Sequence, residues 1–445
     1  MHVVVIGAGE VGTTIAENLS PDHDVTIIDI DPERAEQLKY GLDVLTLGGD
    51  GTSLSTQEAA NVAASDMVIA CTDDDLTNLV ACGTAKTLGD PFTVARTKST
   101  EYLWTWERDN SAFGVDFMVC TDLLTAQDIV RVIGLPAAID VDQFADGTVQ
   151  MAEFEVKDES PVAGQTIEEA DRFDSLTFVG VFRDGSMILP RGDTVIEDGD
   201  RTVVIGSPES VQLFASDIAP ETTPNEADEI VIVGGSEVGF QTARLLEKRG
   251  LSPRLIEQNS KRARWLAEHL PDTYVMEHDA TDTEFLAREH VDQADIVVAA
   301  LDSDEKNLLV SVLAQRLGCA RVISVVDSGE YVALFEQIGI DVAINPRRVT
   351  AEEITRFTFD KIAENIAVLD DDLAEVVEVE LGIDSELVGR RIDELVQEIE
   401  ATFVIGAITR NGSLITPRGD TKFRHNDHVI AFVETPFVGE FISMA

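Results

Sequence analysis

His2-Val3-Val4-Val5-Ile6-Gly7-Ala8-Gly9-Glu10-Val11-Gly12 is the stretch that decides the fold. A β-branched apolar run ends on a glycine and passes into a helical pattern, which is typical of the first strand, turn and helix of a doubly wound parallel sheet. In this spacing Gly7 permits a tight turn, Gly9 leaves room for a pyrophosphate, and Gly12 lets the helix pack close to the sheet. The stretch therefore predicts a nucleotide site, with the N–H groups around Glu10 and Val11 directed at a phosphate.

A carboxylate follows at the distance that such a site requires. The apolar run 25–28 predicts a second strand, and Asp29 ends it, 22 residues after Gly7. A carboxylate there accepts hydrogen bonds from both ribose hydroxyls of an adenosine and disfavours a 2′-phosphate. The sequence therefore favours NAD(H) or ATP/ADP over NADP.

The same phrase returns 227 positions later, at Glu229–Gly239. Ser236 stands where Gly9 stood, so a side chain narrows the approach to the backbone, although its hydroxyl can also donate to a phosphate. Glu257 takes the place of Asp29. We expect a second site that differs from the first in affinity or in nucleotide. Its residues are Gly234, Ser236, Glu237, Val238, Gly239 and Glu257.

Other candidate residues follow the remaining strands, which we predict at 2–6, 24–28, 43–47, 67–70 and 92–95. Loops that leave the carboxyl ends of parallel strands lie on the ligand side of the sheet. The candidates there are Asp50, Thr72, Asp73, Asn78 and Arg96, and Asp279 corresponds to Asp50 in the second half. Arg96, just after the fifth strand, is placed to contact a phosphate. Val325 corresponds to it in the second half, where Arg254 or Arg262 is the expected substitute.

A different pattern follows each of these halves. Short alternating runs with Asp-Gly or Asn-Gly turns predict a small α+β domain built mainly of hairpins, and Pro-Arg-Gly-Asp-Thr occurs at 190–194 and again at 417–421. Two patterns that repeat in the same order indicate an internal duplication. The predicted fold class is α/β, with Rossmann-like doubly wound domains at 1–135 and 228–365, each followed by a small α+β domain, at 140–217 and 372–445.

The composition is strongly acidic, with 83 Asp and Glu against 33 Lys and Arg and a formal net charge of −50. Such a surface repels nucleic acid, and it suits molar salt, in which the Debye length falls to about 3 Å. We therefore expect a halophilic source and no nucleic-acid partner. No apolar run approaches the roughly 20 residues that span a bilayer, and no basic region precedes the first strand. We expect a cytoplasmic protein without direct membrane insertion.

Taken in this order and duplication, the motifs resemble those of one known family. They are the Gly7-x-Gly9-x-x-Gly12 turn with Asp29, the Thr72-Asp73-Asp74-Asp75-x-x-Asn78 loop, and the twice-used hairpin that ends in Pro-Arg-Gly-Asp. Over nearly its whole length the chain is similar to the TrkA family. Its members are peripheral subunits of Trk-type potassium uptake systems, built from RCK (regulator of K⁺ conductance) N and C domains.

The resemblance implies a regulatory protein, with no catalytic residue and no metal site. In that family the RCK N domains bind NAD(H) or ATP/ADP, and the RCK domains assemble as a homo-oligomeric ring. The ring binds a membrane K⁺ transporter subunit at the inner face of the cell membrane. Differential binding of nucleotides to two ring shapes would shift the gate, and a phosphate-contacting arginine such as Arg96 would distinguish ATP from ADP.

Two alternatives stay open at this point. An NAD-dependent oxidoreductase needs a general acid or base beside the nicotinamide, and none of the seven histidines has a convincing place for it. A divalent-cation-sensing RCK protein would use carboxylates of the small domains, but spacing is uninformative among 83 acidic residues. The sequence does not specify the activating nucleotide, whether the second site binds, the oligomeric state or the transporter.

Overall fold

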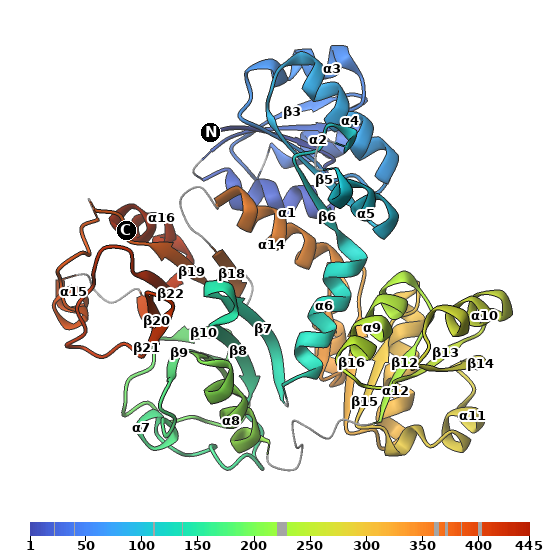
Figure 1. Cartoon of the computed structure of the whole chain (residues 1–445), viewed down its shortest axis with the longest axis vertical. Coiled ribbons are helices and arrows are strands. Elements are labelled where there is room, and N and C mark those ends of the chain that lie inside the picture. The colour runs from blue at the N-terminus through green and yellow to red at the C-terminus, as the bar shows by residue number, and fades with distance from the viewer. Residues whose placement is uncertain are drawn as a thin grey trace. The chain divides into compact units, whose positions relative to one another are not determined.

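The computed structural model describes residues 1–21, 23–39, 41–109, 112–135, 137–219, 229–359, 365–369, 373–383, 385–398 and 403–445. The chain forms two compact units, and each draws on both halves of the sequence. Unit 1 is Met1–Val130 with Asp228–Thr355, and unit 2 is Arg131–Ala227 with Arg356–Ala445. Figure 1 labels the helices and strands of both units.

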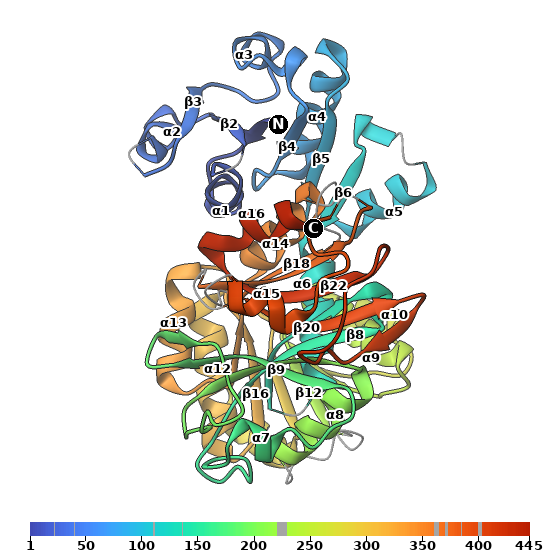
Figure 2. The same ribbon diagram turned by 90° about the vertical axis from the view of Figure 1, so that its left-hand side faces the viewer.

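The first half of unit 1 is a parallel sheet of six strands in the order β3-β2-β1-β4-β5-β6. Helices α1 and α4 lie on opposite sides of this sheet (Figure 2), so its central strands are buried on both faces. The strands are β1 (His2–Ile6), β2 (Asp24–Asp29), β3 (Val44–Gly48), β4 (Met67–Ala70), β5 (Phe92–Thr97) and β6 (Phe117–Cys120). The helices are α1 (Glu10–Leu19), α2 (Pro32–Leu38), α3 (Leu54–Ala59), α4 (Asp75–Leu88), α5 (Thr100–Arg108) and α6 (Thr121–Ile133).

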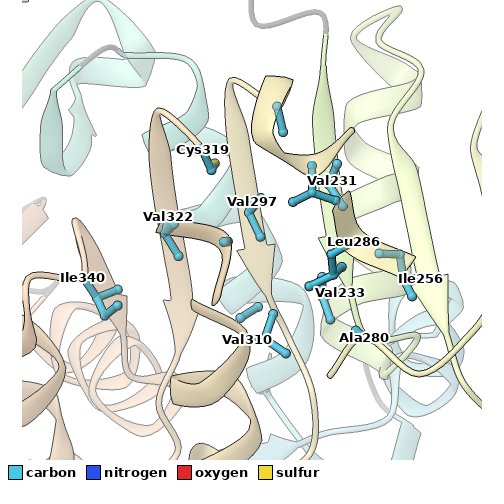
Figure 3. Close-up of a cluster of buried hydrophobic side chains, with 14 of the residues drawn as sticks. Val231, Val233, Ile256, Ala280, Leu286, Val297, Val310, Cys319, Val322 and Ile340 are labelled. Atoms are coloured by element: carbon cyan, nitrogen blue, oxygen red, sulfur yellow. The ribbon is translucent and has the colours of Figure 1, made fainter. Parts of the chain in front are cut away.

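The second half of unit 1 repeats this sheet in the order β14-β13-β12-β15-β16-β17. Its apolar core packs β-branched strand residues such as Val231, Val297 and Val322 against the covering helices (Figure 3). The strands are β12 (Ile230–Val233), β13 (Arg254–Glu257), β14 (Tyr274–Glu277), β15 (Ile296–Ala299), β16 (Arg321–Val325) and β17 (Val342–Ile344). The helices are α9 (Glu237–Lys248), α10 (Ser260–His269), α11 (Thr283–Arg288), α12 (Asp304–Leu317), α13 (Gly329–Ile338) and α14 (Pro346–Phe359).

Unit 2 holds two five-stranded antiparallel sheets, in the orders β10-β9-β11-β8-β7 and β18-β19-β22-β20-β21. The two sheets share an apolar cluster, in which a Cβ on Gly180 would lie 2.6 Å from the ring of Phe432. The first sheet has β7 (Ala138–Phe144), β8 (Val149–Glu155), β9 (Leu176–Arg183), β10 (Ser186–Ile188) and β11 (Arg201–Gly206), with α7 (Ile167–Ala170) and α8 (Pro208–Ile218). The second has β18 (Asn365–Leu369), β19 (Ala374–Glu380), β20 (Phe403–Arg410), β21 (Ser413–Ile415) and β22 (His428–Glu434), with α15 (Ile392–Glu398) and α16 (Val438–Met444).

The predicted fold class is confirmed, but element limits differ from those read from the sequence. The fifth strand runs to Thr97, so the prediction that Arg96 follows the strand is wrong, and Arg96 lies inside β5. The short strand β6 and the helix α8 were not predicted. Residues 217–228 have the polar, proline-containing composition that predicts a linker, and residues 220–228 of this segment lie outside the described residues.

Candidate functional site

In the first glycine turn, one of the three glycines is not required by the fold itself. Gly7 has φ +112°, a left-handed conformation that favours glycine, and a Cβ on Gly12 would lie 1.9 Å from the carbonyl oxygen of Gly7. Gly9 differs from both, because its φ is −75° and a Cβ there would meet no heavy atom within 4 Å. Open space therefore lies beside Gly9, where the sequence places a pyrophosphate.

The helix that follows this turn begins without a side-chain cap. Gly9 is the N-cap residue of α1, and no side chain accepts from the first turn. The first N–H groups of a helix lack carbonyl partners within the helix, and here the helical bonds start with Thr13 N–H to the Gly9 carbonyl, at 2.9 Å. The side chains of Val11 and Ile15 are buried. The helix therefore presents uncapped donors and the positive end of its dipole beside the open space.

Asp29 ties the end of β2 to this turn. The residue is 7% exposed; its Oδ2 accepts from Ala8 N–H at 2.6 Å and its Oδ1 from Asp31 N–H at 2.8 Å. An ionised carboxylate has about four acceptor positions. Two of them remain for other donors, such as a ribose.

Two of the other candidates are occupied by contacts within the protein. Asp50 is exposed, and its Oδ1 accepts from the N–H and hydroxyl of Thr52 at 2.9 and 2.7 Å, which lowers the pKa of Asp50. Asn78 is fully buried, and its Nδ2 donates to the carbonyl oxygens of Thr72 and Arg96. Its Oδ1 accepts from the N–H and hydroxyl of Thr72 at 2.9 and 2.7 Å. Asn78 therefore fixes the loop between β4 and α4.

Arg96 has protein partners for its guanidinium. The residue is 3% exposed; its Nη1 lies 3.0 Å from Asp73 Oδ1 and 3.3 Å from the Thr72 carbonyl, and its Nε donates to Thr121 Oγ1 at 3.1 Å. Although partial burial opposes the effect, the hydrogen bond and charge of Arg96 hold the pKa of Asp73 below its usual value. A phosphate that approaches Arg96 therefore competes with the carboxylate of Asp73.

The second glycine turn has the same backbone but is capped. Gly234 has φ +111°, and a Cβ on Gly239 would lie 2.1 Å from the Gly234 carbonyl oxygen. The Ser236 hydroxyl accepts from Gly239 N–H at 3.2 Å and donates to the Ala300 carbonyl at 2.7 Å. A side chain of the protein therefore uses one of the donors that remain uncapped on α1, and Val238 is buried like Val11.

An arginine also covers this second turn. Glu257 copies Asp29, because it accepts from Gly235 N–H at 2.8 Å and from Asn259 N–H at 2.6 Å. Arg262 Nε donates to the Gly235 carbonyl at 2.7 Å, and its guanidinium stacks on Trp265 at 4.3 Å. Of the two arginines proposed to replace Arg96, Arg262 therefore lies at the turn.

The other proposed arginine does not lie at the turn. Arg254 begins β13, at the amino end of the sheet, and bonds the Glu289 carbonyl and Glu229. Asp279 copies Asp50, because its Oδ1 accepts from the N–H and hydroxyl of Thr281 at 2.9 and 2.8 Å. The second half thus keeps the turn after β14 but loses the cation at the end of β16, where Val325 stands.

The two halves of unit 1 contact each other through the first residue of each nucleotide-type helix. Glu10 Oε1 accepts from Gly329 N–H at 2.9 Å, and Glu10 Oε2 lies 3.0 Å from Arg347 Nη1. In the reciprocal contact, Thr100 Oγ1 lies 3.3 Å from Glu237 Oε1. Gly329 and Thr100 are the first residues of α13 and α5. Glu10 and Glu237 therefore occupy equivalent places in the interface, with their carboxylates engaged by the opposite half.

A second contact connects Arg96 to the opposite half. Thr121 Oγ1, which accepts from Arg96, lies 3.0 Å from Thr350 Oγ1 on α14, and both threonines are buried. The sequence reading did not single out Thr121, Arg347 or Thr350. The apolar run Phe117–Cys120 was the available signal for Thr121, because it marks a sixth strand and thus the helix that begins after it.

We expect Arg347→Met to lower the free energy of unfolding by roughly 1–2 kcal/mol, because it removes the partner of Glu10 and of Asp327 (2.7 Å) at a partly buried contact. The matched control is Arg348→Met, because the Arg348 side chain is 56% exposed and its Nε lies 3.2 Å from Glu352 Oε1 on the same helix. Urea denaturation of the full chain measures both. If both variants lose the same free energy of unfolding, the contact between Arg347 and Glu10 does not stabilise the chain as proposed.

Comparison with known families accounts for all four parts of the chain. Residues 3–121 and 230–346 match the TrkA-N domain, and residues 151–219 and 376–442 match the TrkA-C domain. The N-type matches fall on the two parallel sheets of unit 1, and the C-type matches fall on the antiparallel sheets of unit 2. Within the described residues, no helix combines the length and the apolar character that crossing a membrane requires.

Relatives at full length carry the same domain order. The Trk system potassium uptake protein TrkA homolog 1 of Methanosarcina mazei is 34% identical over 444 residues, 97% of each chain. The TrkA homolog of Archaeoglobus fulgidus is 35% identical over 434 residues, 98% of this chain and 97% of the relative. The GsuK channel bound to NAD has the same fold, with a TM-score of 0.61 at 20% identity over 100% of this chain and 79% of that one. The duplicated domain order and this identity over the full length show that the chain belongs to the TrkA family of Trk potassium uptake systems.

Proposed function

We propose that the protein is a nucleotide-binding regulatory subunit of a potassium uptake system, with its main site at the first glycine turn. The observation that carries this proposal is the uncapped N-terminus of α1 beside open space at Gly9. Gly7 and Gly12 are needed by the fold, whereas glycine at position 9 is not. A ligand that approaches the backbone closely gives Gly9 a purpose that packing does not supply.

The expected pose follows from the groups around this turn. The pyrophosphate of NAD(H), or the phosphates of ATP or ADP, would lie against the N–H groups that begin α1. The ribose would donate to the free acceptor positions of Asp29. Glu10 bonds the second half instead of facing the turn, so its negative charge is partly neutralised where the phosphates would bind. The similar GsuK channel, which is bound to NAD, supports a nucleotide of this class.

The contacts around this site supply a path from ligand to assembly. A phosphate that draws Arg96 from Asp73 would act on Thr121, which contacts both Arg96 and Thr350. Glu10 supplies a second connection, from the glycine turn to Gly329 and Arg347. A nucleotide shifts an equilibrium only by its difference in affinity between two states. We propose that these contacts differ between two shapes of an RCK ring, which opens or closes a membrane K⁺ transporter on its cytoplasmic side.

Regulation explains these residues better than hydride transfer does. An oxidoreductase needs a general acid or base close to the nicotinamide. In the first half, His2 begins β1 at the end opposite the glycine turn, with Nε2 3.3 Å from Thr26 Oγ1. No contact in the described part of the chain favours an enzyme or a divalent-cation sensor, and we propose neither.

The second turn is proposed as a weaker site, which Ser236→Gly tests. We expect this change to strengthen nucleotide binding there about tenfold, or about 1.4 kcal/mol, because it frees Gly239 N–H and removes the side chain from the approach. Replacing an N-cap serine with glycine costs only a few tenths of a kcal/mol, so the fold tolerates it. Calorimetric titration on a Gly9→Glu background isolates this site, and Ser236→Ala controls for the loss of the hydroxyl alone. If Ser236→Gly leaves the nucleotide affinity of the second turn unchanged, the Ser236 cap is not the cause of the weaker binding there.

The function itself is tested by nucleotide-dependent assembly. We expect the full chain to change its hydrodynamic radius or its oligomer distribution between saturating ATP, ADP, NAD and NADH, measured by light scattering at constant KCl. Asp29→Asn should reduce this response, because it replaces the carboxylate that accepts hydrogen bonds from the ribose hydroxyls. A response that is identical for all four nucleotides would contradict a regulatory site of this kind.

A further inference from the structure

The interface between the two halves of unit 1 has two equivalent corners, one around Glu10 and one around Glu237. Equivalent positions in the two corners carry opposite charges. Strand register sets the equivalence, since Val94 pairs with Phe117 in one sheet and Ile323 with Val342 in the other. Asp122 and Arg347 are then equivalent, each the second residue of the helix that follows the last strand. Lys98 and Asp327 are equivalent in the same way, in the loops after β5 and β16.

At the corner that contains Arg347, the carboxylates are paired with a cation of the protein. The Arg347 guanidinium lies 3.0 Å from Glu10 of the opposite half and 2.7 Å from Asp327 of its own half. One guanidinium thus neutralises two carboxylates, and it keeps its charge at any physiological pH.

The corner that contains Asp122 has no guanidinium that pairs with both carboxylates: Arg262 Nη2 lies 3.7 Å from Glu237 Oε2 and leaves Asp122 unpaired. Asp122 is half-buried, and within the described residues its carboxylate has no hydrogen bond or ion pair. Lys98, Asp75 and Arg96 of its own half and Glu237 of the opposite half act on it. Burial, with the charges of Glu237 and Asp75, raises the pKa of Asp122 to about 7 against the opposing effect of Lys98 and Arg96. Asp122 is therefore short of positive charge.

A cavity occupies this corner. Its volume is about 750 Å³, and Asp75, Lys98, Trp104, Asp122, Glu237 and Trp265 are among the residues that line it. That volume is in the range of sites for small organic molecules. The aromatic walls carry arginines already, with Arg244 5.2 Å from the ring of Trp104 and Arg262 4.3 Å from that of Trp265. The rings of Trp104, Phe240 and Trp265 nevertheless supply apolar lining for a stem, while the free carboxylate of Asp122 suits a positive head.

We propose that this cavity binds a small organic cation, an amine or guanidinium on an apolar stem. Its head lies between Asp122 and Glu237, in the place that Arg347 occupies at the equivalent corner. Lys98, Arg244 and Arg262 also line the cavity, but Arg262 is paired with Glu237 and both arginines lie over tryptophan rings, so the unpaired charge in the cavity is the carboxylate of Asp122. No group of three or more His, Cys, Asp or Glu that could hold a metal ion occurs in the described part of the chain, which favours an organic head over a bare divalent ion. The site is separate from the first glycine turn, adjoins the second through Glu237 and Arg262, and needs no nucleotide.

Binding of this kind should depend on pH with a defined sign. Only ionised Asp122 attracts the cation, and its pKa is about 7. The affinity should therefore fall about tenfold per pH unit below 7 and level off above it. Without ligand, Asp122 contributes stability at low pH that is lost as pH rises from about 4 through 7. Asp122→Asn should remove both dependences.

Titration with agmatine, which has a guanidinium and an amine on a four-carbon stem, tests the proposal on the full chain at pH 8 and constant KCl. Two of the three tryptophans of the chain, Trp104 and Trp265, line the cavity, so fluorescence and calorimetry both report binding. We expect saturable binding that weakens at least tenfold in Asp122→Asn. The double variant Lys98→Asp/Asp122→Arg copies the corner that contains Arg347, and it should remain folded and lose binding.

Three results would overturn the proposal. The first is absence of saturable agmatine binding, and the second is equal binding to wild type and Asp122→Asn. The third is displacement of agmatine from the wild-type chain by KCl and by NaCl to the same extent, which would assign the corner to an inorganic monovalent ion. None of these measurements includes a nucleotide, so the function proposed above is tested separately.

Discussion

Gly9→Glu is expected to weaken nucleotide binding at the first site by more than about 100-fold, or about 2.7 kcal/mol, while the chain stays folded. A side chain at this position points into open space, because a Cβ on Gly9 meets no heavy atom within 4 Å, and the φ of −75° suits any residue. The glutamate would occupy the approach to the N–H groups of α1 and repel the phosphates. Calorimetric titration with the best-binding nucleotide measures the loss.

The matched control for this change is Gly9→Ala. Alanine at the same position has no charge and little bulk, so we expect a smaller loss of affinity and a thermal midpoint near that of wild type. If Gly9→Glu binds nucleotide as wild type does, the phosphate does not lie against this turn. The proposed main site would then be wrong.

Gly12→Ala is expected to lower the free energy of unfolding by roughly 3 kcal/mol or more. The added Cβ would lie 1.9 Å from the carbonyl oxygen of Gly7, 3.0 Å from its carbonyl carbon and 3.2 Å from Cys71 Sγ. Because two of these atoms are backbone, α1 has to move away from β1 to admit the methyl group. Urea denaturation of the full chain measures the loss.

Gly9→Ala again serves as the control, because it adds the same atom three residues earlier in the same turn without a contact. Its free energy of unfolding should stay within about 0.5 kcal/mol of wild type. Gly239→Ala should behave like Gly12→Ala, since its Cβ would lie 2.1 Å from the Gly234 carbonyl oxygen. Similar stabilities for Gly12→Ala and Gly9→Ala would contradict the distinction between a glycine required by packing and one retained for a ligand.

The fold was predictable because its signals are local and occur twice. A glycine with positive φ after a β-branched run, such as Gly7 or Gly234, marks the turn into the first helix in both halves. Strand ends were less predictable, since hydrogen bonding to β6 extends β5 through Arg96 and Thr97. The four-residue run Phe117–Cys120 is apolar without alternation, and such a run does not by itself distinguish a buried strand from a buried helix segment.

The location of the candidate site could be predicted, but the partners of its residues could not. Carboxyl ends of parallel strands place Asp29, Thr72 and Arg96 on one edge of the sheet. That Arg96 bonds Asp73 and Thr121 depends on side-chain packing, which no spacing encodes. The Ser236 hydroxyl caps its own helix, an option that the sequence left open beside a contact with phosphate.

The interface between the halves was beyond sequence reasoning for a different reason. Glu10 and Arg347 are more than 300 positions apart, and an acidic residue among 83 carries no signal of its partner. The same holds for Asp122, whose environment includes Glu237 from the other half. Duplication gives the two halves one fold, while single substitutions such as Gly9 to Ser236 and Asp122 to Arg347 make their sites unequal.

The central claim is that a nucleotide binds chiefly at the first glycine turn, and its most direct test is the number of nucleotides bound per chain. The wild-type chain is titrated by calorimetry with NAD, NADH, ATP and ADP in molar KCl. The account predicts saturable binding of at least one of them, with one tighter and one weaker site per chain. Absence of saturable binding by all four nucleotides, or two sites of equal affinity, would contradict it.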